Sequence, residues 1–456
     1  TTEIYTLSLH DALPISAPDR LILKYADSGS NPDEPKNKYD WNKLKNFNDV
    51  NVPPYKSEKY KPIFNQLSIF PVLRLDNYTK DNNILDMIKP GIYFFSDELM
   101  SRLSIFGGAF INRKWERDLF LNFRYDYGMP VARDFFDGIG FSPAFVFEGY
   151  NVTRKADAQV IAGIDSISIG VSYDLLAFDL GFEFKLFNPH HNLKAGYQFQ
   201  KYASLIDNFV IPSSNLQVRG SREDYFKANG FYLTYKYENY FPTKDRDINP
   251  YGRKINIRYD YEASDINPEY LVNDDGTLST IYANNKLHKL EGDWLEAYKI
   301  FNKHTLSFKF RGAVIFGPEV DNFYNYYASG LIGMKGYPFY ALGGGRMATL
   351  NVAYRFPLFS NIDTRISPLY FDKLYFSVYG DIGNAWEERR TKLNDFKKDA
   401  GFELRLQAFT SYAFPTSIFF NAAYGFDEFT KNFRGTKVTY GKEWRLYFGV
   451  LFGFDI

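Results

Sequence analysis

The segment 445–456, with the sequence RLYFGVLFGFDI, constrains the fold more than any other part of this chain. Every second residue from Leu446 to Ile456 is apolar, whereas the alternate positions from Arg445 to Asp455 are mixed. Because successive side chains of a β-strand point to opposite faces, the segment predicts a strand with one wholly apolar face. It is also long enough to cross a bilayer as a tilted strand. This combination predicts a membrane-spanning strand of an outer-membrane β-barrel.

The same alternation recurs along the chain, and the polar positions carry full charges of both signs. Such positions suit a wet lumen. A soluble β-sandwich or propeller also has strands with one apolar face, but there a second sheet would have to cover the row of phenylalanines near residue 452. We therefore predict an all-β fold, a transmembrane antiparallel β-barrel of about sixteen strands. The charged residues expected to line its lumen are Arg124, Arg258, Lys309, Arg311, Glu403 and Arg405.

Sixteen is an even number, as in single-chain bacterial barrels. The segment 66–76 is an alternative to the first of these strands. The predicted strands lie near residues 90–98, 101–112, 116–127, 140–150, 158–174, 177–187, 190–203, 228–240, 253–264, 286–300, 303–315, 347–357, 373–382, 399–410, 416–426 and 445–456.

Three regions are expected along the chain. Residues 1–16 resemble the translation of a sequencing-adapter read-through and are treated as an artefact. Residues 17–65 are rich in Pro, Asn, Lys and Asp, which is typical of a linker or an irregular periplasmic segment. The barrel is expected over 66–456. The chain is thus expected to be a fragment, the C-terminal part of a longer protein.

Composition excludes several classes of function. Lys+Arg and Asp+Glu are both 54, so no basic excess directs the protein to nucleic acid. No run of 18 apolar residues predicts a transmembrane helix. The absence of cysteine excludes disulfides, zinc–thiolate sites and cysteine nucleophiles.

Enzyme motifs are also absent from the sequence. None of the five histidines falls in H-E-x-x-H spacing, and there is neither a G-x-S-x-G motif nor a Walker loop. The pair His190–His191 and the acidic run 274–276 fit ordinary turns better than metal sites. We expect no enzyme, no catalytic residue, no metal and no cofactor.

Three motifs resemble the surface-antigen (D15-like) superfamily of outer-membrane barrels, which includes the outer-membrane protein assembly factor and the two-partner secretion transporters. The segment 334–337 (MKGY) is similar to the family's Arg-Gly-Phe/Tyr loop motif. The segment 380–386 (GDIGNAW) is similar to its Asp-x-Gly-x-x-Trp strand end. The third motif resembles the C-terminal signal by which barrels are recognised for insertion; its residues are Phe448, Gly449, Phe452 and Phe454.

The resemblance implies that a long loop folds back into the lumen and is pinned there. Lys335, Gly336 and Tyr337 would form the tip of the loop, and Asp381 would be the partner of the tip cation. The sequence departs from the family pattern, because the tip cation is Lys instead of Arg and the glutamate of the following strand aligns with Ala353. A lysine cannot make the two-pronged contact of a guanidinium with a carboxylate.

The resemblance implies a role in polypeptide insertion or translocation in the bacterial outer membrane. One alternative is a plugged pore or transporter for small polar solutes; another is the barrel anchor of a missing N-terminal enzyme or propeller domain. Expected partners are outer-membrane lipid and, during biogenesis, the barrel assembly machinery. If the protein handles polypeptides, its partners would also include client polypeptides or periplasmic accessory proteins.

Overall fold

The computed structural model describes most of the chain from residue 67 onward. The predicted artefact at 1–16, the predicted linker at 17–65 and Phe454 of the predicted insertion signal lie outside the described residues and stay predictions. The described ranges are 67–75, 84–98, 102–126, 143–162, 165–240, 251–301, 303–317, 321–366, 369–388, 390–410, 414–433 and 436–452.

Antiparallel strands make up most of the described chain, and one sheet contains seventeen of them. Sixteen of these strands are long, once the three-residue β17 (Thr364–Ile366) is set aside. This confirms the predicted all-β barrel fold and its number of strands. The long strands are β1 (Ser68–Leu75), β2 (Ile88–Asp97), β3 (Leu103–Ile111), β4 (Arg117–Tyr125), β5 (Ala144–Ala162), β6 (Asp165–Leu186), β7 (His191–Ile206), β10 (Ser221–Tyr240), β11 (Gly252–Val272), β12 (Leu278–Phe301), β13 (His304–Phe316), β16 (Arg346–Phe359), β18 (Leu369–Trp386), β19 (Lys397–Thr410), β20 (Phe414–Gly425) and β23 (Trp444–Phe452).

Short helices and strands lie in the connections between these long strands. No helix within the described ranges is long and apolar enough to cross a membrane. The short elements are the helix α2 (Ile84–Met87), the hairpin β8–β9 (Phe209–Ile211 and Leu216–Val218), η2 (Asn322–Tyr324), β14 (Tyr326–Tyr327), η3 (Phe339–Ala341), β15 (Gly343–Gly344), η4 (Leu393–Asp395) and the hairpin β21–β22 (Phe429–Phe433 and Thr436–Tyr440).

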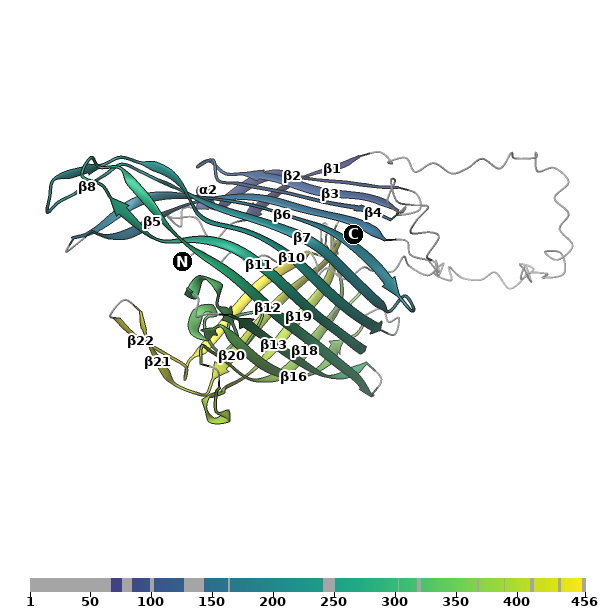
Figure 1. The fold of residues 1–456 in the computed structure, drawn as a ribbon. Helices are drawn as coiled ribbons and strands as arrows, with labels where there is room; N and C mark the ends of the chain where they lie inside the picture. The colour runs from purple at the N-terminus through teal and green to yellow at the C-terminus, as the bar shows by residue number, and fades with distance from the viewer. Residues whose placement is uncertain are drawn as a thin grey trace, which may run out of the picture.

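Each long strand pairs antiparallel with the next long strand along the chain, and the sheet curls into a barrel (Figure 1). At one end, here called the loop end, the connections include 207–220, 317–345 and 426–443. At the other, the turn end, they include the short 187–190 and 302–303. Outer-membrane barrels have short periplasmic turns and longer extracellular loops, so the loop end faces the outside of the cell.

The first and last strands of the barrel lack a mutual partner. Within the described residues, β1 pairs with β2 alone and β23 pairs with β20 alone. Their outer edges therefore bound a seam, and we use this word for the region between β1 and β23. A strand at the edge of a sheet presents backbone N–H and C=O groups that can pair with another chain.

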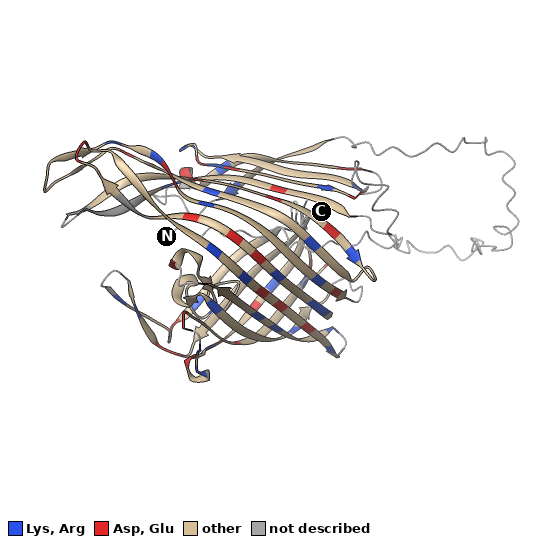
Figure 2. Ribbon diagram, viewed as in Figure 1, with Lys and Arg blue, Asp and Glu red and all other residues tan. Residues whose placement is uncertain are grey.

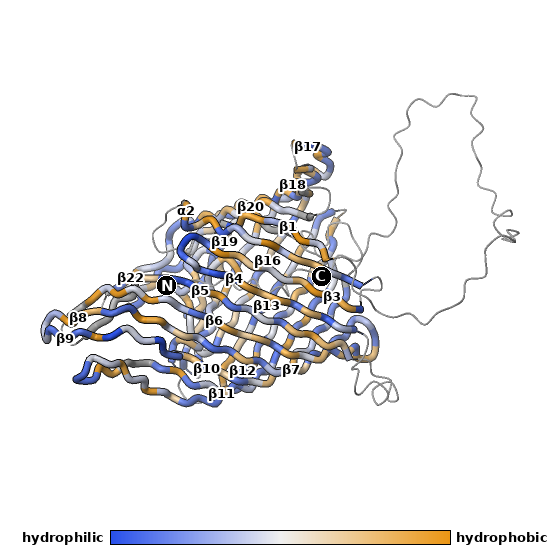
Figure 3. The backbone as a smooth tube through the Cα atoms, turned by 90° about the horizontal axis from the view of Figure 1, so that it is seen from above, coloured by the Kyte–Doolittle hydropathy of each residue, from blue (hydrophilic) through white to orange (hydrophobic). Residues whose placement is uncertain are grey.

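Side-chain alternation gives the barrel a dry outer face and a polar inner face. On β18, Tyr375, Ser377 and Asp381 are buried inside, whereas Val378 is 43% exposed on the outside. Figure 3 shows the same alternation of apolar and polar residues along the strands. Charges of both signs are interspersed along the strands in Figure 2. This is the arrangement expected when lipid covers one face of each strand and the lumen lies against the other.

Two errors in the predicted strand positions cancel in the predicted number. Strand β1 shows that the alternative first strand at 66–76 exists in addition to the one near 90–98. The predicted strand 158–174 is wrong, because it covers the end of β5 and the start of β6, which pair with each other. The alternation continues at the same parity within each of these long strands, so the sequence pattern did not mark the reversal.

Candidate functional site: the loop that crosses the lumen

The connection between β13 and β16 folds into a compact body inside the barrel. We call its residues 321–345 the lumenal loop. Ala328, Met334 and Tyr337 in this loop are all fully buried. Its backbone closes on itself, since the N–H of Ala328 donates to the carbonyl of Leu342 at 2.8 Å and the N–H of Met334 donates to the carbonyl of Ala328 at 2.9 Å. A loop with its own small core behaves as a solid plug instead of a loose strap.

One end of the lumenal loop is anchored on strands β10 to β12. The ring of Phe323 packs on that of Phe226, with the centroids 4.7 Å apart. The hydroxyl oxygen of Tyr324 lies 2.8 Å from Oγ of Ser264 and accepts a hydrogen bond from Nδ2 of Asn285 at 3.2 Å. These wall residues come from three neighbouring strands, and all three point inward.

The tip of the loop is anchored on the far wall, at strands β19 and β20. The N–H of Gly336 donates to Oδ2 of Asp399 at 2.7 Å. The hydroxyl of Tyr337 donates to the carbonyl of Lys398 at 2.8 Å and accepts from the N–H of Asp427 at 3.0 Å. Burial raises the pKa of this loop tyrosine to about 12, so its hydroxyl stays a donor at neutral pH. The lumenal loop therefore spans the lumen from wall to wall.

The tip cation was predicted to contact Asp381, and the structure gives it a different neighbour. The ammonium of Lys335 lies over the ring of Tyr379, 4.4 Å from its centroid, a cation–π contact. The carbonyl of Lys335 accepts a hydrogen bond from the hydroxyl of Tyr447 on β23 at 2.8 Å. Within the described residues no ion pair joins Lys335 to Asp381, which instead accepts from the side-chain amide of Asn351. The tip is thus held by hydrogen bonds to its backbone and to Tyr337, and the lysine head packs on an aromatic ring.

The two acids near the tip face each other across strands β18 and β19. Asp381 and Asp399 are register partners, and both are buried. Oδ2 of Asp381 and Oδ1 of Asp399 lack a hydrogen-bond donor within the described residues. Two buried carboxylates in contact are stable only if a proton or a cation lies between them. The ammonium of Lys335 lies near this region, because it covers the ring of Tyr379, two residues before Asp381 on β18.

Close backbone approach explains why the tip carries glycine. A β-carbon added to Gly336 would lie 2.6 Å from Cβ of Asp399 and 2.8 Å from the backbone nitrogen of Gly425. A β-carbon on Gly425 would in turn meet the carbonyl oxygen of Gly336 at 2.8 Å. Both positions need a residue without a side chain, so the Lys-Gly-Tyr segment fits this wall of the barrel geometrically.

The charged residues predicted to line the lumen are brought together with acids on neighbouring positions. Arg124 pairs with Glu183 at 2.7 Å, and Arg311 pairs with Asp293 at 2.9 Å. Lys309 points inward on β13, two residues from Arg311. The wall therefore presents alternating charges and not a single-sign field.

Two further predicted lumenal pairs follow the same rule. Nη2 of Arg258 lies 2.7 Å from Asp260, and Nη2 of Arg405 lies 2.6 Å from Glu403. Arg258 also lies over the ring of Tyr232, 4.3 Å from its centroid. Each pair joins alternate residues of one strand, so the pairing needs no contact across the lumen.

The predicted insertion signal lies at the seam. Phe448 is 74% exposed on the outer face of β23, and Gly449 lies on the inner face against the ring of Phe419. Phe452 pairs in register with Thr416 of β20. This arrangement gives β23 an apolar outer face, as the alternation predicts.

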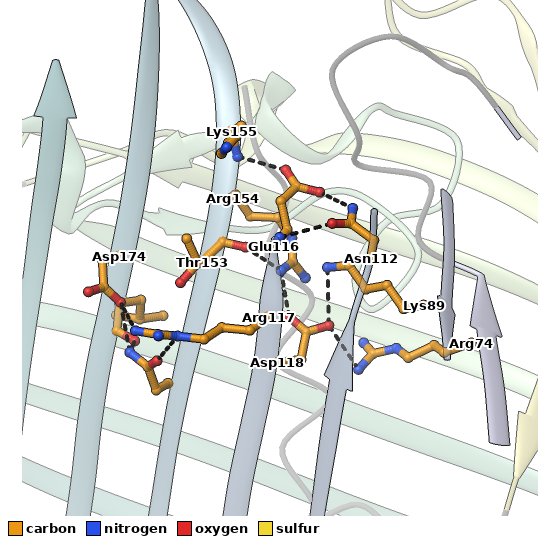
Figure 4. A network of polar contacts seen from close by, with 12 residues as sticks. Arg74, Lys89, Asn112, Glu116, Arg117, Asp118, Thr153, Arg154, Lys155 and Asp174 are labelled. Atoms are coloured by element: carbon orange, nitrogen blue, oxygen red, sulfur yellow. Dashed lines mark hydrogen bonds and ion pairs between the residues drawn. The ribbon is translucent and has the colours of Figure 1, made fainter. Parts of the chain in front are cut away.

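One buried polar cluster was missed by the sequence interpretation. Asp118 on β4 lies 3.4 Å from the ammonium of Lys89 and 3.4 Å from the guanidinium of Arg74, and it also accepts from Arg154 (Figure 4). Lys89 is fully buried, which makes Asp118 its counter-ion. Asp118 has the inward parity of Arg124 in the run 118–126, so the signal was present. The distant partners, which lie on three other strands, could not be found from it.

Asp399 was missed in the same way, although it has the inward parity of Glu403. No group of three or more His, Cys, Asp or Glu side chains in the described part of the chain is arranged to hold a metal ion.

The fold defines the class of this protein. Sixteen long antiparallel strands with apolar residues outside and charges inside are the arrangement by which β-barrels cross the outer membrane. The chain is a β-barrel protein of the bacterial outer membrane, and a folded loop crosses its lumen.

Comparisons with known proteins find similar solved structures but no family. No family model and no curated protein matches the chain. Among solved structures it is similar to CdiB from Escherichia coli, with 11% identity, a TM-score of 0.47, and 84% of this chain and 62% of that chain covered. For CdiB from Acinetobacter baumannii the identity is 11% and the TM-score 0.44, with 85% of this chain and 65% of that chain covered. For the copper transporter OprC the identity is 10% and the TM-score 0.33, with 77% of this chain and 55% of that chain covered. The chain spans less than two thirds of each of these proteins. Because all three TM-scores lie below one half, no argument about function rests on them.

Proposed function

We propose that this barrel handles polypeptides, and that it promotes the insertion of other outer-membrane proteins at its seam. The observation that carries the proposal is the combination of a lumen crossed by a folded loop with outer edges of β1 and β23 that have no strand partner among the described residues. A client strand could pair with an exposed edge, which is the β-augmentation mode of recognition. We further propose that the chain belongs to the superfamily that its motifs resemble.

The first strand favours this role because it is weakly held. β1 has only eight residues, and Ile69 and Leu73 are 55% and 74% exposed. Among the described residues, β2 is its one strand partner. Short edge strands are a common means of limiting unwanted pairing, and they also exchange partners most readily.

The lumenal loop argues against the alternative of an open pore for small polar solutes. The loop bridges β10–β12 on one wall and β19–β20 on the other, and its centre is fully buried. A barrel of this kind should conduct little in a planar bilayer. Large steady conductance that is unchanged on deletion of the loop 317–345 would favour the pore instead.

Photo-crosslinking tests the proposal directly. Vesicles containing the chain should accelerate folding of an unfolded outer-membrane barrel protein. A photo-reactive residue in place of Leu73, which is 74% exposed on the outer face of β1, should trap that client, whereas the same residue in place of Phe231 should not. Phe231 is a matched control, because it is 63% exposed on the outer face of β10, a strand with partners on both sides. Equal trapping at the two positions would overturn insertion at the seam.

The proposal assigns no catalytic step to the chain. Its partners would be client polypeptides, outer-membrane lipid, the barrel assembly machinery that inserts the chain itself, and any periplasmic accessory protein that delivers the client.

A further inference from the structure

A charged groove lies on the outer surface of the barrel, where lipid-facing side chains are otherwise apolar. Its volume is about 360 Å³, and strands β4, β5, β6, β7 and β10 contribute to it. Arg117, Lys201 and Arg222 supply three cations to the lining, whereas Asp174 supplies one carboxylate. Asp224 of β10 adds a second carboxylate beside the groove, since it pairs with Lys201 at 2.7 Å. The groove therefore carries a net positive charge.

Strand parity places these charges outside the barrel. Arg117 shares its face of β4 with Leu119, which is 40% exposed, and Asp174 shares its face of β6 with Leu176, which is 44% exposed. Lys201 is the register partner of Leu176. The inward cluster around Asp118 lies on the opposite face of the sheet and does not contribute to the groove.

The groove lies at the upper edge of an apolar band. Below Asp174, the outward residues of β6 are all Leu or Phe as far as Leu186. These twelve residues cover a height of about 30 Å for a strand tilted by about 40°. The apolar band of an outer-membrane barrel is about 25 Å tall. Because β6 ends at the turn 187–190, Asp174 lies above the apolar band, and the groove sits at the level of the headgroups of the outer leaflet.

The cations are held in place before any ligand arrives. Nη2 of Arg222 lies 2.7 Å from Asp174, and Nη2 of Arg117 lies 3.8 Å from the same carboxylate. Nε of Arg117 donates to Oδ1 of Asn151 at 2.7 Å, and Nδ2 of Asn151 donates to Asp174 at 2.7 Å. Figure 4 shows Arg117 extended toward Asp174. One carboxylate thus gathers two guanidinium groups, which remain partly exposed and keep further N–H donors available.

We propose that this groove binds the phosphate-bearing headgroup of an anionic lipid of the outer leaflet. The guanidinium groups of Arg117 and Arg222 and the ammonium of Lys201 would pair with the phosphate oxygens, since planar guanidinium forks match phosphate geometry. Leu119 and Leu176, just below the groove, would lie against the first part of an acyl chain. Exposed ion pairs contribute little to the stability of a protein. Stability of the barrel therefore does not explain why three cations lie together here.

Native mass spectrometry of the folded chain in detergent tests the proposal. The probes are diphosphorylated lipid A, its dephosphorylated analogue and inorganic phosphate. The double variant Arg117→Gln/Arg222→Gln should bind diphosphorylated lipid A at least tenfold more weakly than the parent chain, because each charge-assisted contact is worth about tenfold or more. Arg253→Gln is the matched control, since Arg253 is an outward arginine of β11 that pairs with Glu296 at 2.6 Å near the turn end.

The outcomes separate the sources of phosphate. Loss of binding in the double variant, with binding kept in Arg253→Gln and absent for the dephosphorylated lipid, supports the proposal. Equal binding of the dephosphorylated lipid overturns it, because recognition would then not involve phosphate. Equally tight binding of inorganic phosphate overturns the lipid as ligand. A heat-modifiability gel establishes that each variant is folded, so unchanged affinity in a folded double variant also refutes the site.

Discussion

The fit of Gly336 against the barrel wall gives the sharpest prediction. In Gly336→Ala, the new methyl group would lie 2.6 Å from Cβ of Asp399 and 2.8 Å from the backbone nitrogen of Gly425. Neither contact atom is the far end of a flexible side chain, so the tip must move away from β19 and β20. We predict that the variant weakens docking of the lumenal loop while the barrel remains folded.

The magnitude follows from two limits. If the tip stayed docked, overpacking would cost about 1–3 kcal/mol. If it left, it would lose the bond from Gly336 to a carboxylate, about 1.5–3 kcal/mol, and two bonds of the Tyr337 hydroxyl, about 0.5–1.5 kcal/mol each. The smaller cost decides the outcome. Docking should therefore weaken by about 1–3 kcal/mol, which changes the ratio of docked to undocked loop roughly 5- to 150-fold.

Thiol labelling measures this ratio. The chain has no cysteine, so Ala328→Cys provides a single thiol at a position that is fully buried in the loop. A methanethiosulfonate reagent should modify it slowly, through the undocked state. Adding Gly336→Ala should raise the labelling rate roughly 5- to 150-fold.

A second glycine provides the control. A β-carbon on Gly380 of β18 would come no closer than 3.7 Å to its nearest neighbour, the carbonyl oxygen of Asp399, which is ordinary contact. Gly380→Ala should leave the labelling rate unchanged. If Gly336→Ala labels no faster than Gly380→Ala in barrels that pass a heat-modifiability test, the described contact of the tip with the wall is not what holds the loop.

Three further predictions concern the same walls. Asp399→Ala should lower the free energy of unfolding by about 1–3 kcal/mol in urea titration, because the N–H of Gly336 loses its acceptor. Asp381→Asn should be tolerated, because the new amide can donate a hydrogen bond to the facing carboxylate of Asp399. Burial holds the pKa of Tyr337 at about 12, above the ordinary 10.0. The phenol of the undocked loop therefore ionises first, and labelling of the thiol in Ala328→Cys, normalised to the unfolded chain, should rise between pH 10 and 12. Tyr337→Phe should abolish that rise. Asp118→Ala should cost about 3–5 kcal/mol in the same titration, since it removes a buried carboxylate that pairs with Lys89, Arg74 and Arg154. A loss below about 1 kcal/mol would count against these pairings.

Alternation along the sequence was sufficient to predict the barrel and the face on which each charge lies. Parity is a local property of a strand, so it placed Asp381 and Glu403 in the lumen without knowledge of the neighbouring strands. It could not identify which acid meets the tip of the loop. That depends on the register between β18 and β19, and on a loop that returns from more than 60 residues away to Asp399.

The length of β5 and β6 explains why the predicted strand boundaries were wrong in this region. β5 and β6 together run from Ala144 to Leu186 with matching periodicity on both sides of their turn. Only two residues, 163–164, lie between the two strands and neither is proline, and alternation placed a boundary within each strand. The number of strands was correct only because the omission of β1 offset the extra strand placed at 158–174.

The lumenal loop and the seam are mechanically linked through the last strand. Tyr447 of β23 donates its hydroxyl to the carbonyl of Lys335, and Asp427, which follows β20, donates its N–H to Tyr337. The loop thus holds one side of the seam from within and fixes it to the far wall through Tyr324. The opposite side, β1, is connected to the rest of the barrel by β2 and by the ion pair of Arg74 with Asp118. If the seam opens, β1 should therefore move and β23 should stay, so release of the loop tip and opening of the seam should be distinguishable by labels on the two strands.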